Sequence, residues 1–183
     1  MVLPVVRTRD EAHLYMDLRP CERCGSAEIT WQSQLTHDGG VPARRYHGTC
    51  AGCGAAREFV FRLPERPAVP GDDGVFFGGP EPSQLLDAGE WRLIADLGVR
   101  EGSAPRTGDP ADDAERQRAF ALALAAMDEI IKFIPDGADG VPESAFWTAR
   151  GRAEYDRNPA SFTRARLEIW RDTFRDEMEM RFG

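Results

Sequence analysis

The stretches CERCG at residues 21–25 and CAGCG at residues 50–54 decide the fold of the N-terminal part of this chain. Each places two cysteines three residues apart and a glycine directly after the second cysteine. Two such cysteines hold one metal ion when the backbone curls around their sulfurs, and glycine tolerates the positive φ that this curl favours. Four thiolates complete the tetrahedron that Zn²⁺ prefers. We therefore predict one structural zinc ion bound by four residues: Cys21, Cys24, Cys50 and Cys53.

The spacer between the two motifs is expected to form a hairpin. Its 25 residues exceed the usual spacer of about 15–20 residues for this ligand pattern. Residues 27–35 read as one strand, residues 36–40 as a polar turn and residues 45–49 as the returning strand. Residues 58–63 read as a third strand, so that each strand lies beside a cysteine pair.

On these two motifs the chain resembles the zinc-ribbon, or rubredoxin-like, group of proteins over residues 20–63. That resemblance implies a three-stranded ribbon with a closed, all-thiolate metal site. It implies little about function, since such ribbons occur in nucleic-acid machinery, in enzymes and in adaptor proteins. No named family is recognised in residues 64–183.

Other roles for the cysteines fit the sequence less well. Disulfide bonds need an oxidising compartment, whereas the first residues show no signal peptide, so we expect a cytoplasmic protein with reduced cysteines. A redox C-x-x-C pair normally opens a helix after a strand, and neither pair is placed in that way. Iron would use the same ligands, although the sequence offers no redox context for it. His47 lies three residues before Cys50 and could replace a cysteine ligand, but four cysteines already suffice.

Outside the cysteine motifs and the hairpin, the sequence predicts helices. Thr8 and Glu11 form a capping box for a short helix that Pro20 ends, and Asp87 and Glu90 repeat the pattern further on. Three more helices are expected, over residues 110–134, about 145–155 and 160–181, the first of them from an apolar stripe at helical spacing.

These elements predict an α+β fold, with an N-terminal helix and a three-stranded zinc ribbon followed by a mostly helical body. The predicted division places the helix and ribbon in residues 1–63, a connection rich in proline and glycine in residues 64–82, and the helical body in residues 83–183.

Charge narrows the classes of partner. The 183 residues carry a formal net charge of -8, and residues 71–183 hold twenty-three acidic against fourteen basic side chains. An acidic body repels phosphate backbones, so broad nucleic-acid binding is disfavoured. No apolar run approaches the roughly 18 residues that a membrane helix needs.

We expect a non-enzymatic protein that binds a macromolecular partner, above all another protein. An immunity- or antitoxin-type inhibitor of a basic protein is one concrete form.

Two surfaces are candidates for that partner. The segment 144–155 concentrates aromatic and arginine side chains, which are enriched at interface hot spots, although its aromatics could equally dock a short helix onto the body. Its predicted partner-binding residues are Phe146, Trp147, Arg150, Arg152 and Tyr155. The rival function is nucleic-acid-associated regulation through a basic face of the ribbon, formed by Arg44, Arg45, Arg57 and Arg62. A third alternative is an enzyme whose active site only folding assembles.

Overall fold

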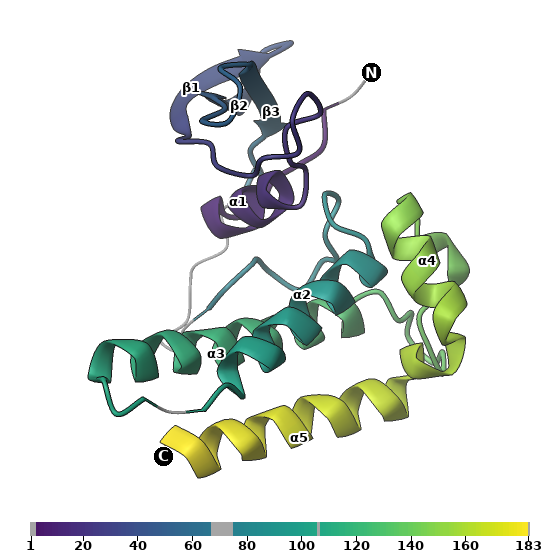
Figure 1. The fold of residues 1–183 in the computed structure, drawn as a ribbon. Coiled ribbons are helices and arrows are strands. Elements are labelled where there is room, and N and C mark those ends of the chain that lie inside the picture. The colour runs from purple at the N-terminus through teal and green to yellow at the C-terminus, as the bar shows by residue number, and fades with distance from the viewer. Residues whose placement is uncertain (1–2, 67–74, 106, 183) are drawn as a thin grey trace. The chain divides into compact units, whose positions relative to one another are not determined.

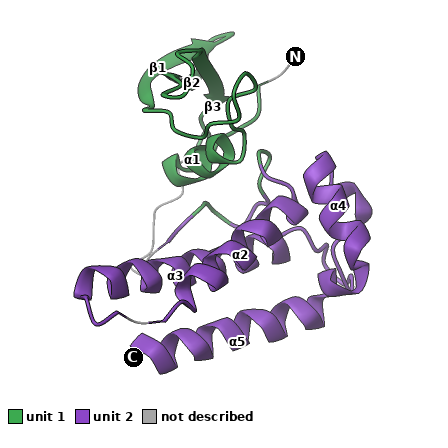
Figure 2. Cartoon of the chain, viewed as in Figure 1, with its two compact units in different colours: residues 1–70, 77–79, 83–85 green, residues 71–76, 80–82, 86–183 purple. Residues whose placement is uncertain are grey.

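The computed structural model describes residues 3–66, 75–105 and 107–182, and these residues confirm the predicted α+β class. They divide into two compact units, coloured separately in Figure 2. Unit 1 comprises residues 1–70, 77–79 and 83–85, and unit 2 comprises residues 71–76, 80–82 and 86–183. The centre of the predicted connection, residues 67–74, lies outside the described residues.

Unit 1 combines one helix with an antiparallel sheet in the order β1-β2-β3 (Figure 1). Its elements are α1 (Arg9–Asp17), β1 (Gln32–Asp38), β2 (Val41–Thr49) and β3 (Ala56–Arg62). The helix has the predicted N-cap, since the Thr8 hydroxyl accepts a hydrogen bond from the N–H of Glu11. The Glu11 carboxylate accepts a hydrogen bond from the N–H of Arg7 at 2.7 Å, one residue before the N-cap position that the capping box predicted. An isolated parallel bridge between Val5 and Arg62 ties the N-terminal segment to β3.

The hairpin differs from the predicted one in its turn. Residues 36–38 were expected to turn the chain, but they belong to β1, and Asp38 pairs with Val41. The turn consists of Gly39 and Gly40 alone, with φ of 57° and 87°. Two consecutive residues with positive φ form a tight turn that matches the twist of the flanking strands, so both strands extend as far as the glycines.

Helix α1 packs on one face of the sheet through aromatic side chains. The ring of Tyr15 meets the rings of Phe59 and Phe61 edge-on, at 5.8 and 5.4 Å between centroids. His13 contacts Tyr46 in the same way at 5.7 Å. Tyr46 and Phe61 are each 2% exposed, so this face supplies the core of unit 1.

Unit 2 is built from helices. They are α2 (Ala88–Gly102), α3 (Pro110–Ile131), α4 (Ala149–Arg157) and α5 (Arg164–Phe182), with 3₁₀ turns at η1 (Glu143–Ala145) and η2 (Pro159–Phe162). Helix α2 packs against α3 and α4, and α3 packs against α5. Trp91 and Phe120 are completely buried in this core. Helix α3 ends three residues before the predicted Ile134, which is still buried in the turn that follows.

Asp87 joins the starts of two helices in unit 2. Its carboxylate caps α2 by accepting a hydrogen bond from the N–H of Glu90 at 2.8 Å. The same carboxylate accepts hydrogen bonds from the N–H and the hydroxyl of Thr148, both at 2.7 Å. Thr148 is in turn the N-cap of α4, where its hydroxyl oxygen accepts from the N–H of Gly151. One buried carboxylate therefore fixes α2 and α4 to each other.

Candidate metal centre

The four cysteine sulfurs of unit 1 form one compact cluster. All four lie within 4.8 Å of one another, with 3.7 Å between the sulfurs of Cys21 and Cys53 and 3.5 Å between those of Cys24 and Cys50. A tetrahedron with metal–sulfur bonds of about 2.3 Å has sulfur–sulfur edges of about 3.8 Å. The cluster therefore has the size of a four-thiolate metal site, and it brings together the four predicted ligands.

Both cysteine pairs reach the cluster through the same backbone turn. In each, the N–H of the first cysteine donates to a carbonyl five residues later, and the N–H of the glycine donates back to the carbonyl of the first cysteine. The two glycines have φ of 74° and 71°, the positive values that the sequence predicted. The donor–acceptor distances are 2.8 Å for Cys21–Ser26, 2.7 Å for Gly25–Cys21, 2.9 Å for Cys50–Ala55 and 2.9 Å for Gly54–Cys50.

The sulfurs of the cluster differ in their affinity for protons. The backbone N–H of Arg23 is the main cause that lowers the pKa of Cys21 to about 6. For Cys24, the hydrogen bond from the backbone N–H of Ser26 acts to lower the pKa. The hydrogen bonds of the Cys24 thiol with the sulfurs of Cys53 and Cys50, together with desolvation of this thiol, outweigh that effect and raise its pKa to about 12. A metal ion that binds all four sulfurs as thiolates must therefore displace protons.

Within the described ranges, the four cysteines are the one group of three or more potential metal-ligating side chains close enough to share an ion. His47 is not part of it. It lies on β2, paired in register with Gln32 and Glu58 of the neighbouring strands. Its Nδ1 is buried without a hydrogen-bond partner among the described residues.

The predicted partner-binding segment divides between core and surface. Phe146 is 2% exposed, and its ring contacts those of Tyr155 at 4.5 Å and Phe162 at 4.8 Å. Trp147, the next residue, is 49% exposed. Arg150 is exposed, and the partly exposed Arg152 forms an ion pair with Glu143. The side chains available to a partner are Trp147, Arg150 and Arg152, with part of Tyr155.

The four ribbon arginines of the rival function do not share one face, and they are engaged within unit 1. Arg44 and Arg45 are neighbours in β2 and therefore point to opposite faces of the sheet. Their contacts are Arg44 with the Ser33 hydroxyl at 3.2 Å, Arg45 with Glu58 at 3.6 Å, Arg57 with the Pro20 carbonyl at 2.9 Å, and Arg62 with Asp38 at 2.8 Å.

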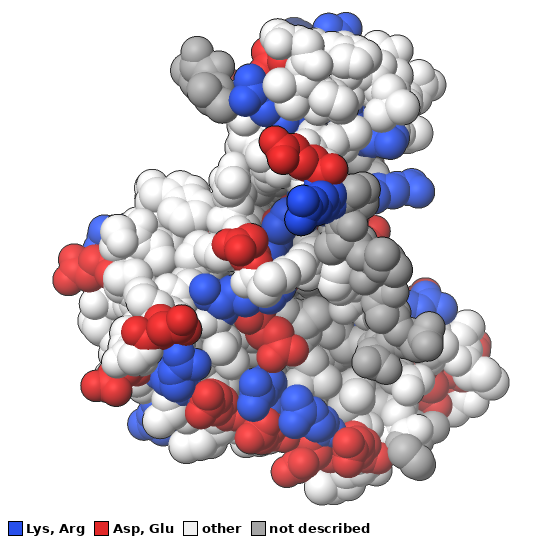
Figure 3. Space-filling model, turned by 180° about the vertical axis from the view of Figure 1, so that it is seen from behind, with Lys and Arg blue, Asp and Glu red and all other residues white. Residues whose placement is uncertain are grey.

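On the face that Figure 3 displays, the acidic side chains of unit 2 do not gather into one patch. Figure 3 shows acidic and basic side chains interspersed over the face of this unit that it displays. Several carboxylates pair with arginines one helical turn away, such as Asp96 with Arg92 at 2.9 Å and Glu177 with Arg181 at 3.0 Å. Among the described helices, none is long and apolar enough to cross a membrane.

Comparison with models of protein families, with curated proteins and with solved structures finds no match to this chain. The arrangement of the four cysteines is consistent with a zinc-ribbon-like site, on the geometry given above.

Sequence reasoning missed a second feature of unit 1, a cavity of about 380 Å³ beside the sheet. Residues of the N-terminal segment, of β2 and of the stretch after β3 line it, and among them are Arg9, Arg44 and Tyr46. The available signal was the spacing of Arg44 and Tyr46, which places both side chains on the same face of β2.

Proposed function

We propose that this protein is a zinc-stabilised, non-enzymatic binding protein, in which unit 1 holds one structural Zn²⁺ and unit 2 binds a protein partner. The closed set of four sulfurs within 4.8 Å of one another carries the metal part of this proposal. Four protein ligands leave no coordination position for water or a substrate, so the ion supports the fold of unit 1 and does no chemistry. The proposed ligands are Cys21, Cys24, Cys50 and Cys53.

Trp147 supports the partner-binding part of the proposal. Its ring contacts the ring of Phe133 at 5.9 Å, and half of its surface is exposed. The residues on either side hold it in place, because Phe146 is buried and the N–H of Thr148 donates to the buried carboxylate of Asp87. A rigidly held tryptophan loses little conformational entropy on binding, and tryptophan is enriched at interface hot spots. We therefore take Trp147 as the anchor.

The charge of unit 2 favours a basic partner, as for an immunity- or antitoxin-type inhibitor. Residues 71–183 have a net charge of -9, from twenty-three acidic and fourteen basic side chains, and opposite charge speeds association. Because the carboxylates are interspersed with arginines, this attraction acts mainly on the encounter and weakens with salt. Arg150 and Arg152 would contact carbonyl or aromatic groups of such a partner rather than its cations.

Elemental analysis tests the metal part. Protein purified without added metal should contain about one zinc ion per chain, as one four-thiolate site requires. Iron in place of zinc would overturn the choice of metal. Two disulfide bonds in the protein, seen by mass spectrometry under non-reducing conditions, would overturn the site itself.

A matched pair of variants tests the partner surface. For a protein that the wild type binds, Trp147→Ala should raise the dissociation constant of the complex at least tenfold. Truncation of a hot-spot residue costs more than about 1.4 kcal/mol of binding free energy. Ile169→Ala removes an apolar side chain that is 58% exposed on α5 and should leave the complex intact. Equal loss with both variants would contradict the proposed anchor. Sub-micromolar binding to mixed DNA and RNA at physiological salt, abolished by Arg44→Glu and Arg57→Glu, would favour the nucleic-acid function instead.

A further inference from the structure

The two edges of the sheet in unit 1 are protected to different extents. At the outer edge of β3, the N–H of Arg62 donates to the carbonyl of Pro4 at 3.0 Å, and the carbonyl of Arg62 accepts from the N–H of Val6 at 2.9 Å. Strand β3 also carries the charged residues Arg57 and Glu58. Strand β1 forms the other edge, and in the described part of the chain no strand pairs with its outer side. This edge therefore remains open to another strand.

The open edge presents the backbone groups of alternate residues of β1. The carbonyl of Pro42 accepts a hydrogen bond from the N–H of Leu63 at 2.9 Å, so it points away from β1. His37 lies opposite Pro42 and therefore directs its own N–H and carbonyl away from β2. Because this direction alternates along a strand, Leu35 and Ser33 do the same. Each of these residues offers one donor and one acceptor to a neighbouring strand.

The side chains of β1 do not shield this edge. Proteins usually protect an exposed edge strand with charged residues, with proline or with a bulge. The sequence of β1, QSQLTHD, contains neither lysine nor proline, and its register with β2 runs without a bulge from Gln32 to Asp38. Its one acidic residue, Asp38, stands beside the turn and pairs with Arg62 at 2.8 Å. An unprotected edge of this kind is a template for pairing with another chain.

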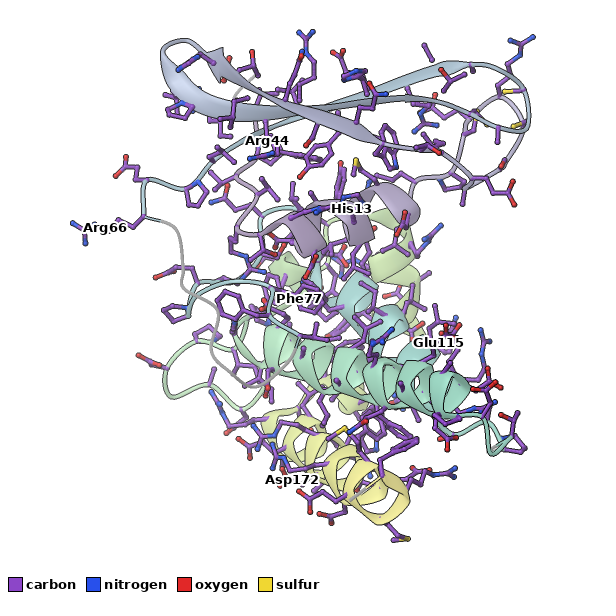
Figure 4. The ribbon with its side chains drawn as sticks, turned by 90° about the vertical axis from the view of Figure 1, so that its left-hand side faces the viewer. His13, Arg44, Arg66, Phe77, Glu115 and Asp172 are labelled. Carbon is purple, nitrogen blue, oxygen red and sulfur yellow. The ribbon has the colours of Figure 1, made fainter. Side chains whose placement is uncertain are left out.

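Leu35 lies at the centre of the open edge, and the fold of unit 1 leaves it uncovered. Figure 4 shows Arg44 on the side of the sheet that faces α1. Leu35 pairs in register with Arg44, so its side chain lies on the same face. The aromatic contacts of α1 with this face are made by Tyr46 of β2 and by Phe59 and Phe61 of β3. Leu35 remains 67% exposed, and its apolar surface is available for burial against a second strand.

We propose that two copies of this chain pair through β1, antiparallel about a two-fold axis at Leu35, and join their three-stranded sheets into one. In this register the Leu35 side chains of the two copies meet, and Ser33 of each copy lies opposite His37 of the other. The outward backbone groups of these residues then complete their hydrogen bonds in the second copy. This interface lies in unit 1 and does not involve Trp147, the proposed anchor for a protein partner.

The charges of β1 favour a second copy of the same strand in the antiparallel orientation. The two Asp38 side chains would lie at opposite ends of the paired strands, about 20 Å apart, which exceeds the Debye length of about 8 Å. A parallel pair would place them side by side, and like charges directly opposite each other are destabilising. His37, the other titratable residue of β1, meets the uncharged Ser33. The strand is therefore complementary to itself.

Sedimentation equilibrium and amide exchange of the metal-loaded, full-length protein test the proposal. One short strand pair is a small interface, so we expect a dimer with a dissociation constant of about 10–100 μM. In the dimer the amide protons of Ser33, Leu35 and His37 should exchange with solvent at least tenfold more slowly than in the monomer, whereas those of Gln34 and Thr36, which point to β2, should change little. A protein that stays monomeric up to about 1 mM, or a dimer whose outward amides keep their monomer exchange rates, would overturn the proposal.

Charge substitutions at Leu35 test the register. Leu35→Lys and Leu35→Glu each place two like charges opposite each other, so each variant should dimerise at least tenfold more weakly than the wild type. Because Leu35 is mostly exposed, both variants should fold, and the dispersion of their amide chemical shifts checks this. An equimolar mixture of the two should form a heterodimer, seen by native mass spectrometry, since opposite charges then meet.

Ile169→Lys serves as the matched control for these variants. It makes the same kind of change at an apolar residue of α5 that is 58% exposed, and it should leave the dissociation constant of the dimer unchanged. Three results would contradict the proposal: single Leu35 variants that dimerise as tightly as the wild type, a mixture without the heterodimer, or an equal loss in Ile169→Lys.

Discussion

The two units of this protein are stabilised by different means. In unit 1 most of β1 is exposed, Leu35 at 67%, and the chain is drawn together at its two cysteine turns. In unit 2, by contrast, Trp91, Phe120 and Leu167 are fully buried between helices. A small sheet with one open face buries too little apolar surface to stabilise itself, and the proposed Zn²⁺ would supply the missing free energy. A larger helical core has no such need.

Removing one of the proposed metal ligands should produce the largest difference in stability between the two units. In Cys50→Ser we expect unit 1 to lose its metal and its sheet, since a structural zinc site contributes about 10 kcal/mol or more to folding. Unit 2 should keep its helices, because its core contains no metal ligand among the described residues. Zinc content and amide chemical-shift dispersion would measure the first effect, and circular dichroism the second. Loss of all helicity would show that the two units fold together. Thr49→Ser, at an exposed neighbouring position, serves as the control.

A substitution at a close contact in unit 2 should destabilise that unit and leave unit 1 intact. A Cβ at Gly151 would overlap the carboxylate of Asp87, and one at Gly89 would overlap the backbone of Gly151. Gly151→Ala should therefore destabilise unit 2 by about 3 kcal/mol, because neither the buried carboxylate nor the backbone can move aside freely. Chemical denaturation followed by helical circular dichroism measures this loss, and zinc content should not change. Ala153→Ser, at an exposed position of the same helix, should shift the midpoint denaturant concentration little. A shift as large as that of Gly151→Ala would contradict the steric explanation.

A milder change at the same junction removes hydrogen bonds without adding bulk. Thr148→Ala loses the hydroxyl that donates to Asp87 and caps α4, and the free energy of unfolding of unit 2 should fall by about 2 kcal/mol. Thr148→Ser retains the hydroxyl and should recover most of that stability. If both variants unfold at the wild-type denaturant concentration, the hydroxyl contributes nothing to the junction.

Acidification should weaken metal binding in unit 1. The pKa of Cys24 is raised to about 12, so its proton is present at pH 7 and competes with the metal. Lowering the pH from 7 to 6 should then weaken zinc binding at least tenfold, or about 1.4 kcal/mol. Below pH 6 the loss should steepen, as Cys21, whose pKa is about 6, also takes up a proton. Competition with a chelator of known affinity measures the trend, and affinity that is constant from pH 7 to 6 would contradict it.

Much of the fold was predictable because its signals are local. The capping residues Thr8 and Asp87 and the glycine after each cysteine pair act within one turn of backbone, and each lies where the sequence placed it. The hairpin turn was predicted too long, because polar residues 36–38 were read as turn when they are the exposed end of a strand. Polarity alone does not distinguish a turn from a strand with an open face.

The sequence by itself determined which four cysteines form the cluster, the α+β class and the starts of the first helices, because the spacing of two cysteines and the geometry of a cap depend on neighbours in the chain. Only the tertiary structure decided that Phe146 is buried while Trp147 is exposed, that Asp87 reaches Thr148 sixty-one residues away, and that the hydroxyl of Tyr46 has no hydrogen-bond partner among the described residues. Each of these outcomes depends on which surface a side chain meets once distant segments pack together, and no local pattern carries that information.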